Sequence, residues 1–481
     1  MNRWAAVILA AGKGTRIKSS KPKVLHSIAG REMLRYVVEA ARKITPRRLA
    51  IVASDESAKR VKEIFGNTVD YVIQSEPLGT AHALKQARPT LERQVDQVLV
   101  MNGDMPLISP ETLSAMMDHH NRSEAVLTLL TCPPVDTEGL ERILYDASGR
   151  VIGVVADQSP DGMPTPIRSG SVVGAGGKVG EVGSGIYCFI SSWLWPNLER
   201  LSQTRSGEYH LSGLVSVAAE AGQKIETFHT ENRLEVVGIN NRIRLSQVEE
   251  EMRSRIRQRI MLAGVTLINP PSILIDFDVS IGQDTVIYPN TMIMGKTSIG
   301  AECTIGPSSI ILDSTLGERC RVQASVIEGS VVENEVGIGP FSHVRAESHI
   351  CSDVHIGNYA EIKKSRLGRG TKMGHFSYIG DAEVGENVNI GAGTITCNFD
   401  GVRKNKTVIG NDAFIGSDSM LIAPVTIGER SVTGAGSVIN RDVPPDKVAV
   451  GVPARLRAKK APSYPVADPD EIGAQGRVPS D

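Results

Sequence analysis

An aliphatic residue followed by glycine recurs in the second half of the chain, often at multiples of six residues. The pair begins at Ile281, Ile299, Ile305, Ile338, Ile356, Val384, Ile390, Ile409, Ile415 and Ile427. Ile281 and Ile299 are 18 residues apart, and Ile299 and Ile305 are six apart. Inward aliphatic side chains, with a small residue at corners where a Cβ would crowd, are typical of a parallel β-helix with three hexapeptides per coil. The second half is therefore predicted to be a β-helix.

The first half has another pattern, in which apolar runs alternate with amphipathic segments. We expect strands at residues 3–11, 48–54, 70–74, 97–108 and 124–131, and helices at 31–44, 56–65, 80–92 and 109–121. This alternation predicts a Rossmann-like α/β domain with a mostly parallel sheet. Ligands of such sheets bind beyond the carboxyl ends of the strands.

Residues 240–263, between the halves, contain neither proline nor glycine. They predict one linker helix, capped by an asparagine and ending near Gly264. We therefore expect an α/β domain at 1–233, a linker at 234–263, a β-helix at 264–460 and a tail at 461–481. The tail is rich in Pro and Asp without periodicity, and it is predicted to be disordered.

Charge and hydropathy exclude several classes of partner. The 481 residues carry 53 basic and 54 acidic side chains without a long run of either sign, which argues against nucleic acid or a membrane surface. No apolar stretch approaches the ~20 residues that span a bilayer, and no export signal begins the chain, so a cytoplasmic protein is expected. The cysteines are scattered without metal-ligand spacing and are expected to be free thiols. They are Cys132, Cys188, Cys303, Cys320, Cys351 and Cys397.

The loop after the first predicted strand combines glycines with positive charge. Its main-chain N–H groups can line an anion, and Lys13, Arg16, Lys21 and Lys23 can neutralise phosphate charge. The loop matches neither the Walker A nor the GxGxxG pattern. A glycine that only turns the chain therefore remains an alternative.

Three further features point to a nucleotide and a metal. Gln74, Gly79 and Thr80 lie in a second strand-to-helix turn and offer donors and acceptors suited to the edge of a base. Asp104 follows a very apolar strand, where a carboxylate either caps a turn or binds Mg²⁺. Asn240 can be a second metal ligand, the cap of the linker helix, or both.

The motifs "LAAGKGTR", "KPKVLH", "LGTAHA" and "NGDMPLI", followed by hexapeptide repeats, resemble one bacterial enzyme family. It is the family of bifunctional N-acetylglucosamine-1-phosphate uridylyltransferases and glucosamine-1-phosphate acetyltransferases. The resemblance covers residues 1 to about 452. It implies a nucleotidyltransferase domain with UTP and Mg²⁺, joined to a left-handed parallel β-helix.

By motif match, Lys13, Arg16 and Lys23 would hold phosphates, and Asp104 with Asn240 would hold Mg²⁺. The residues implied to bind the nucleotide are Leu9, Ala10, Ala11, Gly12, Lys13, Arg16, Lys23, Gln74, Gly79 and Thr80.

The sugar side of this domain departs from the family pattern. Glu141 replaces the second glycine of GYGR, Ala156 replaces the acidic residue of VEH, and Gly183 replaces the asparagine of NTG. "EYHLSG" around Tyr209 replaces EYYITD, and residues 159–180 fit the pattern poorly. Lost hydrogen bonds to a substrate cost ~1–3 kcal/mol each. Either the specificity has moved, or the pocket is rebuilt by that stretch, or this half is weakly active.

Residues 341–404 add polar and aromatic groups that a purely structural repeat does not need. A solvated outer face with one longer loop is the simpler alternative. Acyl transfer to an amine, however, needs a base that works near neutrality, and histidine is the side chain suited to this. His375 is therefore the candidate general base.

The repeat half matches the acetyltransferase part of the family closely in "GNYAEIKKSRLGRGTKMGHFSYIGDAEVGENVNIGAGTITCNFDG". The residues implied to bind glucosamine 1-phosphate are Arg345, Lys363, Tyr378, Asn389 and Lys404. The residues implied to meet acetyl-CoA are Ala392, Asn398, Phe399, Ser417 and Ala435. The chain departs at Phe399, where the family usually has Tyr, and at Gly451, where it usually has an Arg. Arg455 is the alternative residue for that contact with coenzyme A.

The family resemblance implies a cytoplasmic homotrimer that makes UDP-N-acetylglucosamine for cell-wall precursors. Acetyl transfer from acetyl-CoA to glucosamine 1-phosphate is expected first, followed by uridylyl transfer from UTP. One alternative is an acetyltransferase whose first half is weakly active or uses another sugar phosphate or nucleotide. Another is a regulatory or assembly protein with a non-catalytic β-helix.

Overall fold

The computed structural model describes residues 3–133, 141–156, 172–173, 177–204 and 207–458. The tail at 461–481 lies outside the described residues, as does most of the segment at 159–180. The chain consists of two compact units, Met1–Ser254 and Arg255–Asp481. The boundary between them lies within the helix at Arg242–Leu262. The three-part division with a tail remains a prediction. No helix in the described part of the chain is both long and apolar enough to cross a bilayer.

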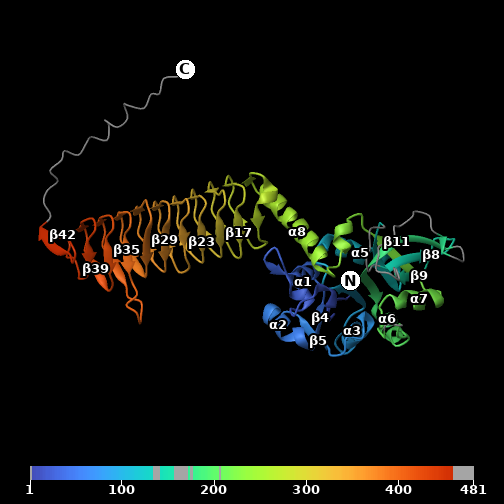
Figure 1. The fold of residues 1–481 in the computed structure, drawn as a ribbon. Helices are drawn as coiled ribbons and strands as arrows, with labels where there is room; N and C mark the ends of the chain where they lie inside the picture. Colours follow the sequence, from blue (N-terminus) through green and yellow to red (C-terminus); the bar gives the residue numbers. More distant parts are fainter. Residues whose placement is uncertain (1–2, 134–140, 157–171, 174–176, 205–206, 459–481) are drawn as a thin grey trace, which may run out of the picture. The chain divides into compact units, whose positions relative to one another are not determined.

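The first unit is built on a central sheet with the strand order β12-β7-β11-β6-β1-β4-β5 (Figure 1). All neighbours in this order are parallel except at β11, which runs antiparallel between β6 and β7. The strands are β1 (Trp4–Ala10), β4 (Arg48–Ser54), β5 (Asp70–Gln74), β6 (Gln97–Asn102), β7 (Leu127–Cys132), β11 (Gly177–Ile190) and β12 (Ile225–His229). Every residue of β1 is buried, as expected for a parallel strand covered on both sides. The mostly parallel sheet is confirmed.

Helices cover both sides of this sheet. They are α1 (Met33–Lys43), α2 (Asp55–Phe65), α3 (Thr80–Gln86), α4 (Arg88–Leu91), α5 (Pro110–Ser123), α6 (Ser191–Leu198) and α7 (Gly213–Glu220). Apolar residues of α3, α6 and α7 join one core with Ala5, Val7 and Leu9 of β1, whereas α1 packs against α5. The helix expected at 80–92 was wrong in one respect, because the structure has two short helices there. Pro89 has no N–H to donate to the carbonyl of Lys85, so one helix cannot run through.

Smaller elements complete this unit. β8 (Glu141–Tyr145) and β9 (Val151–Ala156) form an antiparallel hairpin that is joined to the sheet because β8 pairs with β11. The others are β2 (Ser27–Ile28), β3 (Arg31–Glu32), β10 (Val172–Val173), η1 (Thr15–Ile17), η2 (Lys23–Leu25) and η3 (Arg233–Val236).

The long helix α8 (Arg242–Leu262) is capped by Asn241, whose Oδ1 accepts a hydrogen bond of 2.8 Å from Arg244 N. The predicted cap at Asn240 is therefore wrong, and the neighbouring asparagine does this work. Gly264, with a φ of 96°, follows the end of the helix, as expected for a residue in the left-handed region.

Asn241→Ala should lower the free energy of unfolding by about 1 kcal/mol, because an orphan N–H of the first helical turn loses its partner. Urea denaturation measures this loss. Asn240→Ala is the matched control and should leave stability within about 0.5 kcal/mol of the wild type. An equal loss in both variants would contradict the assignment of the cap.

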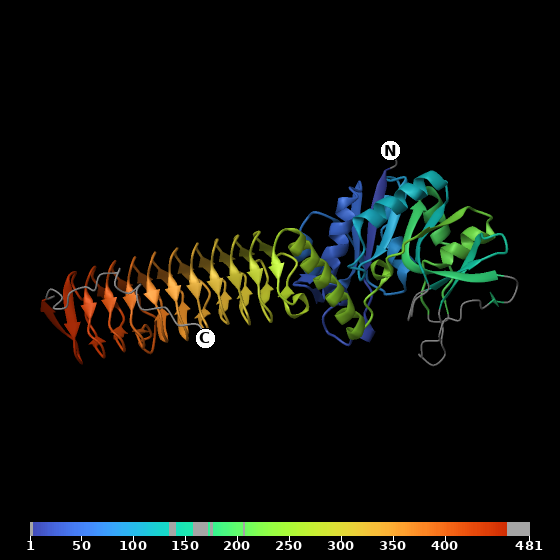
Figure 2. The same ribbon diagram turned by 90° about the horizontal axis from the view of Figure 1, so that it is seen from above.

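The second unit is a β-helix whose short strands stack from coil to coil into three sheets, here called faces (Figures 1 and 2). The aliphatic side chains that point into the β-helix are excluded from solvent. Successive register partners on face 2 are fully buried, namely Ile293, Ile311, Ile327, Val344 and Ile362. Full burial of such a side chain stabilises the fold by about 1.5–3 kcal/mol. The predicted hexapeptide β-helix is confirmed.

Face 1 has twelve strands and includes the only antiparallel neighbours described in this unit's sheets, β42 and β43. Its strands are β13 (Thr266–Leu267), β16 (Val286–Ile287), β19 (Thr304–Ile305), β22 (Arg321–Val322), β25 (Gly337–Ile338), β28 (His355–Ile356), β31 (Lys372–Met373), β34 (Asn389–Ile390), β37 (Phe414–Ile415), β40 (Val432–Thr433), β42 (Lys447–Val450) and β43 (Arg455–Ala458). The short helix η4 (Pro270–Ser272) lies between the first two faces in the chain.

Face 2 has ten strands and face 3 has nine. Face 2 comprises β14 (Leu274–Ile275), β17 (Met292–Met294), β20 (Ile310–Leu312), β23 (Val326–Glu328), β26 (His343–Val344), β29 (Ala360–Lys363), β32 (Ser377–Gly380), β35 (Ile395–Cys397), β38 (Met420–Ile422) and β41 (Val438–Ile439). Face 3 comprises β15 (Ser280–Ile281), β18 (Ser298–Ile299), β21 (Thr315–Leu316), β24 (Val331–Val332), β27 (His349–Ile350), β30 (Arg366–Leu367), β33 (Ala382–Val384), β36 (Thr407–Ile409) and β39 (Val425–Ile427).

One coil carries a loop at residues 398–406. The register partners Ile390 and Ile415 are 25 residues apart, whereas Ile415 and Thr433 are 18 apart, so this coil has seven extra residues. Asp400 organises the loop by accepting hydrogen bonds from the N–H groups of Val402 and Arg403. These bonds, with one from the Asn405 amide, lower the pKa of Asp400 to about 2.

Candidate active sites

The first unit contains a cavity of about 690 Å³ at the carboxyl ends of β1, β5 and β6. Twelve of the residues that the sequence nominated for phosphate, nucleotide and metal lie on its wall, whereas Lys21 does not. They are Leu9, Ala10, Ala11, Gly12, Lys13, Arg16, Lys23, Gln74, Gly79, Thr80, Asp104 and Asn240. The cavity lies where ligands of parallel α/β sheets bind.

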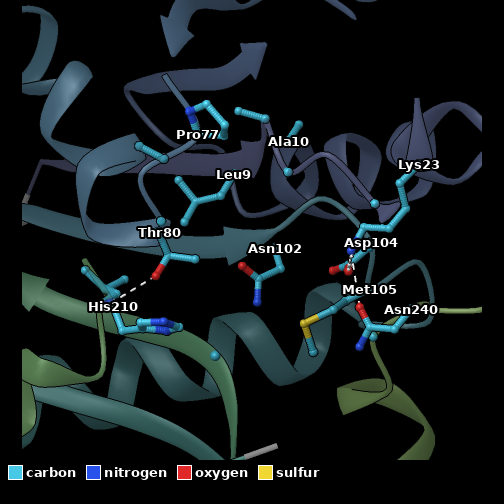
Figure 3. A pocket seen from close by; sticks show the side chains of 18 of the residues that line it. Leu9, Ala10, Lys23, Pro77, Thr80, Asn102, Asp104, Met105, His210 and Asn240 are labelled. Carbon is cyan, nitrogen blue, oxygen red and sulfur yellow. Dashed lines mark hydrogen bonds and ion pairs between the residues drawn. The ribbon is translucent and has the colours of Figure 1, made fainter. Parts of the chain in front are cut away.

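One end of the cavity is built for anions and a cation. Lys23 Nζ lies 2.5 Å from Asp104 Oδ2 and 3.4 Å from Asn240 Oδ1, so both nominated metal ligands point at one positive charge (Figure 3). A main-chain hydrogen bond from Ile239 N to Asp104 O holds the segment that contains Asn240 beside the segment that contains Asp104. A carboxylate and an amide oxygen are donors that Mg²⁺ accepts, with the remaining positions left for water and phosphate oxygens. The donor set therefore fits Mg²⁺.

A second part of the wall presents groups suited to a base. Gln74 is buried, and its Nε2 donates to Gly79 O at 3.1 Å and lies 3.0 Å from His82 Nδ1. With Nε2 engaged in this way, its carbonyl oxygen is left for a ligand. Gly79 has a φ of 98°, and a Cβ there would lie only 2.5 Å from Tyr209 O, so the turn requires glycine.

Sequence reasoning missed several residues of the cavity wall. Asn102, Glu208, His210 and Ser212 line it together with Glu141 and Gly183. Asn102 could have been found, because it ends the apolar strand two residues before Asp104. Glu208, His210 and Ser212 lie in the segment EYHLSG, which departs from the family motif, and the sequence therefore assigned no role to these three side chains. Tyr209 is not among the lining residues; its backbone instead pairs with Leu78 and Ala81.

In the β-helix, four nominated residues occupy equivalent positions on successive coils. Met373, Ile390, Ile415 and Thr433 are register partners. Two residues further along each coil lie His375, Ala392, Ser417 and Ala435. The general-base candidate and the three acetyl-CoA candidates therefore form one column, the corner column, between faces 1 and 2. His375 is exposed and has no hydrogen-bond partner among the described residues.

Two glycines beside the corner column allow the backbones of adjacent coils to approach each other closely. A Cβ at Gly391 would lie 2.5 Å from Ser417 N, and a Cβ at Gly416 would lie 2.5 Å from Thr433 O. Adjacent backbones thus approach each other closely beside the corner column.

The other end of face 2 gathers positive charge. Arg345 and Lys363 are neighbours in register, and Lys404 joins them from the loop at 398–406. The close approach of the Lys404 ammonium group, together with the positive charge of Arg345, lowers the pKa of Lys363. Arg345 is paired with Glu361 at 2.8 Å. Three cations held this close are suited to a phosphate.

Tyr378, Asn398 and Asp381 lie beside these cations. Asn398 Nδ2 donates to Asp381 Oδ2 at 2.5 Å and lies 3.4 Å from the Tyr378 hydroxyl. Asn389 is not with them, because it lies on face 1 before the corner column. Phe399 is exposed in the loop, and the alternative residue Arg455 is exposed in β43. One chain thus distributes the nominated residues over two faces.

Comparison with known proteins matches each half of the chain to a different family. Residues 6–217 match the MobA-like NTP transferase domain, and residues 278–313 and 406–441 match the bacterial transferase hexapeptide family. The bifunctional protein GlmU of Heliobacterium modesticaldum is 41% identical over 453 residues, which is 94% of this chain and 96% of the relative. GlmU of Streptococcus equi subsp. zooepidemicus is 41% identical over 96% of this chain and 98% of the relative. GlmU of Exiguobacterium sibiricum is 39% identical over 96% of this chain and 100% of the relative.

Proposed function

The chain belongs to the family of bifunctional GlmU proteins, and from this membership we propose how its residues divide the work. The protein is a bifunctional enzyme that makes UDP-N-acetylglucosamine. The β-helix transfers the acetyl group of acetyl-CoA to glucosamine 1-phosphate, and the first unit couples the product to UTP. No comparison favours the alternatives of a different substrate or of a purely structural β-helix.

In the first unit, a phosphate oxygen of N-acetylglucosamine 1-phosphate attacks the α-phosphorus of UTP. A new P–O bond forms, and the bond to pyrophosphate breaks. Lys13, Arg16 and Lys23 neutralise the phosphates, while Gln74 and Thr80 hold the uracil edge. Asp104 and Asn240 hold Mg²⁺, which supplies further charge neutralisation when bound. The catalytic effect then comes from positioning and electrostatics.

In the β-helix, His375 takes a proton from the ammonium group of glucosamine 1-phosphate. The freed amine attacks the thioester carbon, a C–N bond forms, and the C–S bond breaks to release coenzyme A. Arg345, Lys363 and Lys404 hold the phosphate, and Tyr378 orients the sugar. The single observation that carries this proposal is the corner column, which sets His375 in line with Ala392, Ser417 and Ala435.

We propose that the active acetyltransferase is a homotrimer. Asn389 and Tyr378 lie on different faces of one chain. A site that uses both residues is formed most simply when one chain contributes Tyr378 and a neighbouring copy contributes Asn389. Because acetyl-CoA and UTP are cytoplasmic metabolites, we place the enzyme there, as a supplier of cell-wall precursors.

Two assays on the purified protein test the proposal. One follows pyrophosphate release from UTP and N-acetylglucosamine 1-phosphate with and without Mg²⁺. The other follows release of coenzyme A from acetyl-CoA and glucosamine 1-phosphate. Both should proceed, and the first should need the metal. Pyrophosphate release with another nucleotide but not with UTP would contradict the proposed specificity.

Lys363→Ala should raise the KM for glucosamine 1-phosphate by about 10- to 100-fold, since a hydrogen bond between charged groups contributes about 1.5–3 kcal/mol. The KM for acetyl-CoA should change little. The matched control is Lys364→Ala, because Lys364 is exposed and pairs with Glu347 at 3.4 Å. Equal effects of the two substitutions would rule out a phosphate site at Lys363.

A further inference from the structure

A largely buried carboxyl group lies in the wall of the cavity in the first unit. Glu141 begins β8, lines the cavity, and accepts a hydrogen bond of 2.6 Å from the hydroxyl of Ser212 on its Oε1. Burial raises the pKa of Glu141, against the opposing effects of the Ser212 hydrogen bond and the nearby charge of His210. A carboxyl group in such a place is costly unless a partner stabilises it.

The second carboxyl oxygen of Glu141 has room for that partner. This oxygen has no hydrogen-bond partner among the described residues, and protein atoms do not enclose it completely. It is therefore accessible from the cavity as an acceptor. The Ser212 hydroxyl fixes one oxygen and leaves the other for a ligand.

The strand register places a glycine next to this carboxyl group. Glu141 is paired directly with Gly183 of β11 on one side and with Ala156 of β9 on the other. Directly opposed residues of antiparallel strands share a face of the sheet. Gly183 lines the cavity together with Glu141 and has no side chain, so no side chain at that position separates the carboxyl group from a ligand.

The charges of the cavity decide which part of a ligand meets Glu141. Lys13, Arg16 and Lys23 attract phosphate, whereas a carboxylate repels it. Glu141 is therefore unsuited to the phosphates of either substrate. A sugar ring offers hydroxyl and amide N–H donors, and these match a free carboxylate oxygen.

We propose that Glu141 is a specificity-determining residue of uridylyl transfer, which accepts a hydrogen bond from the sugar ring of the hexose 1-phosphate. This inference rests on the proposed function of the first unit. Glu141 selects a ring that places a donor at its free oxygen, because an analogue without that donor leaves a buried acceptor unpaired.

The test is the kinetics of Glu141→Ala with UTP and N-acetylglucosamine 1-phosphate. The KM for the sugar phosphate should rise by about 10- to 100-fold, and the KM for UTP should stay within about twofold of the wild type. Glu141→Gln keeps the shape and one carbonyl oxygen, so its effect should be smaller. Ser212→Ala is the matched control, since it removes the inner hydrogen bond but keeps the acceptor. An unchanged KM for the sugar phosphate in Glu141→Ala would overturn the proposal.

Two further measurements separate this proposal from its premises. Acetyl transfer by Glu141→Ala should equal that of the wild type, which shows that the chain is folded. Calorimetric titration with N-acetylglucosamine 1-phosphate measures binding without turnover, and the variant should bind at least about tenfold more weakly. If the wild type binds the sugar phosphate but releases no pyrophosphate, the proposed function is contradicted. The difference in binding between the wild type and Glu141→Ala still tests the role of Glu141. Equal binding by both proteins would overturn that role.

Discussion

His375→Ala should lower kcat for acetyl transfer by about 10²- to 10⁴-fold, while uridylyl transfer by the same protein stays at the wild-type rate. The reason is chemical: a protonated amine has no lone pair, and the substitution removes the group that takes its proton. The KM for acetyl-CoA should change little, because Ala392, Ser417 and Ala435 are retained. Release of coenzyme A measures the first activity, and release of pyrophosphate measures the second.

The matched control for this variant is His355→Ala. His355 is another exposed histidine of the β-helix, but it lies in β28 on face 1 rather than in the corner column. Its loss should leave both activities unchanged. Acetyl transfer at the full rate by His375→Ala would assign the base to another group, and equal losses in the two variants would point to damage to the fold.

Asp104→Ala should lower uridylyl transfer by about 10²- to 10³-fold, because the cation end of the cavity loses its carboxylate. The variant should also need more Mg²⁺ for half-maximal rate, a change that a merely structural role would not produce. Acetyl transfer should be unaffected. A titration of the rate with MgCl₂ measures both effects.

Asp96→Asn is the control for the loss of a carboxylate. Asp96 lies at the surface of the same unit and pairs with Arg3 at 2.7 Å, away from the cavity wall. Its substitution should not change the Mg²⁺ requirement. A Mg²⁺ requirement unaltered in Asp104→Ala would remove this residue from the metal site.

Local patterns were sufficient to predict most of the fold. The expected strands at 48–54 and 70–74 match β4 and β5 to the residue, because apolar runs buried on both faces end sharply at polar turns. The lumen of the β-helix followed from the six-residue period alone. The local errors have local causes. Pro89 divides a helix, and of two adjacent asparagines the second is the cap. The strand expected at 97–108 ends at Asn102, because Gly103 begins a turn.

The candidate sites were predictable only where a motif marks them. Twelve of the nominated residues of the first unit reach one cavity because they follow strands whose carboxyl ends share an edge of the sheet, whereas Lys21 lies outside it. No role could be assigned in this way to His210 and Ser212, because their segment EYHLSG departs from the family motif and reaches the cavity through tertiary packing. The hydrogen bond between Glu141 and Ser212 likewise joins positions 71 residues apart, and no local pattern links them.

The central claim is that one chain carries out both steps, and a single reaction tests it most directly. Purified protein is given glucosamine 1-phosphate, acetyl-CoA, UTP and Mg²⁺, and the products are identified by mass spectrometry. We predict UDP-N-acetylglucosamine with coenzyme A and pyrophosphate, and the intermediate N-acetylglucosamine 1-phosphate at early times. Accumulation of N-acetylglucosamine 1-phosphate without any UDP-sugar would contradict the claim.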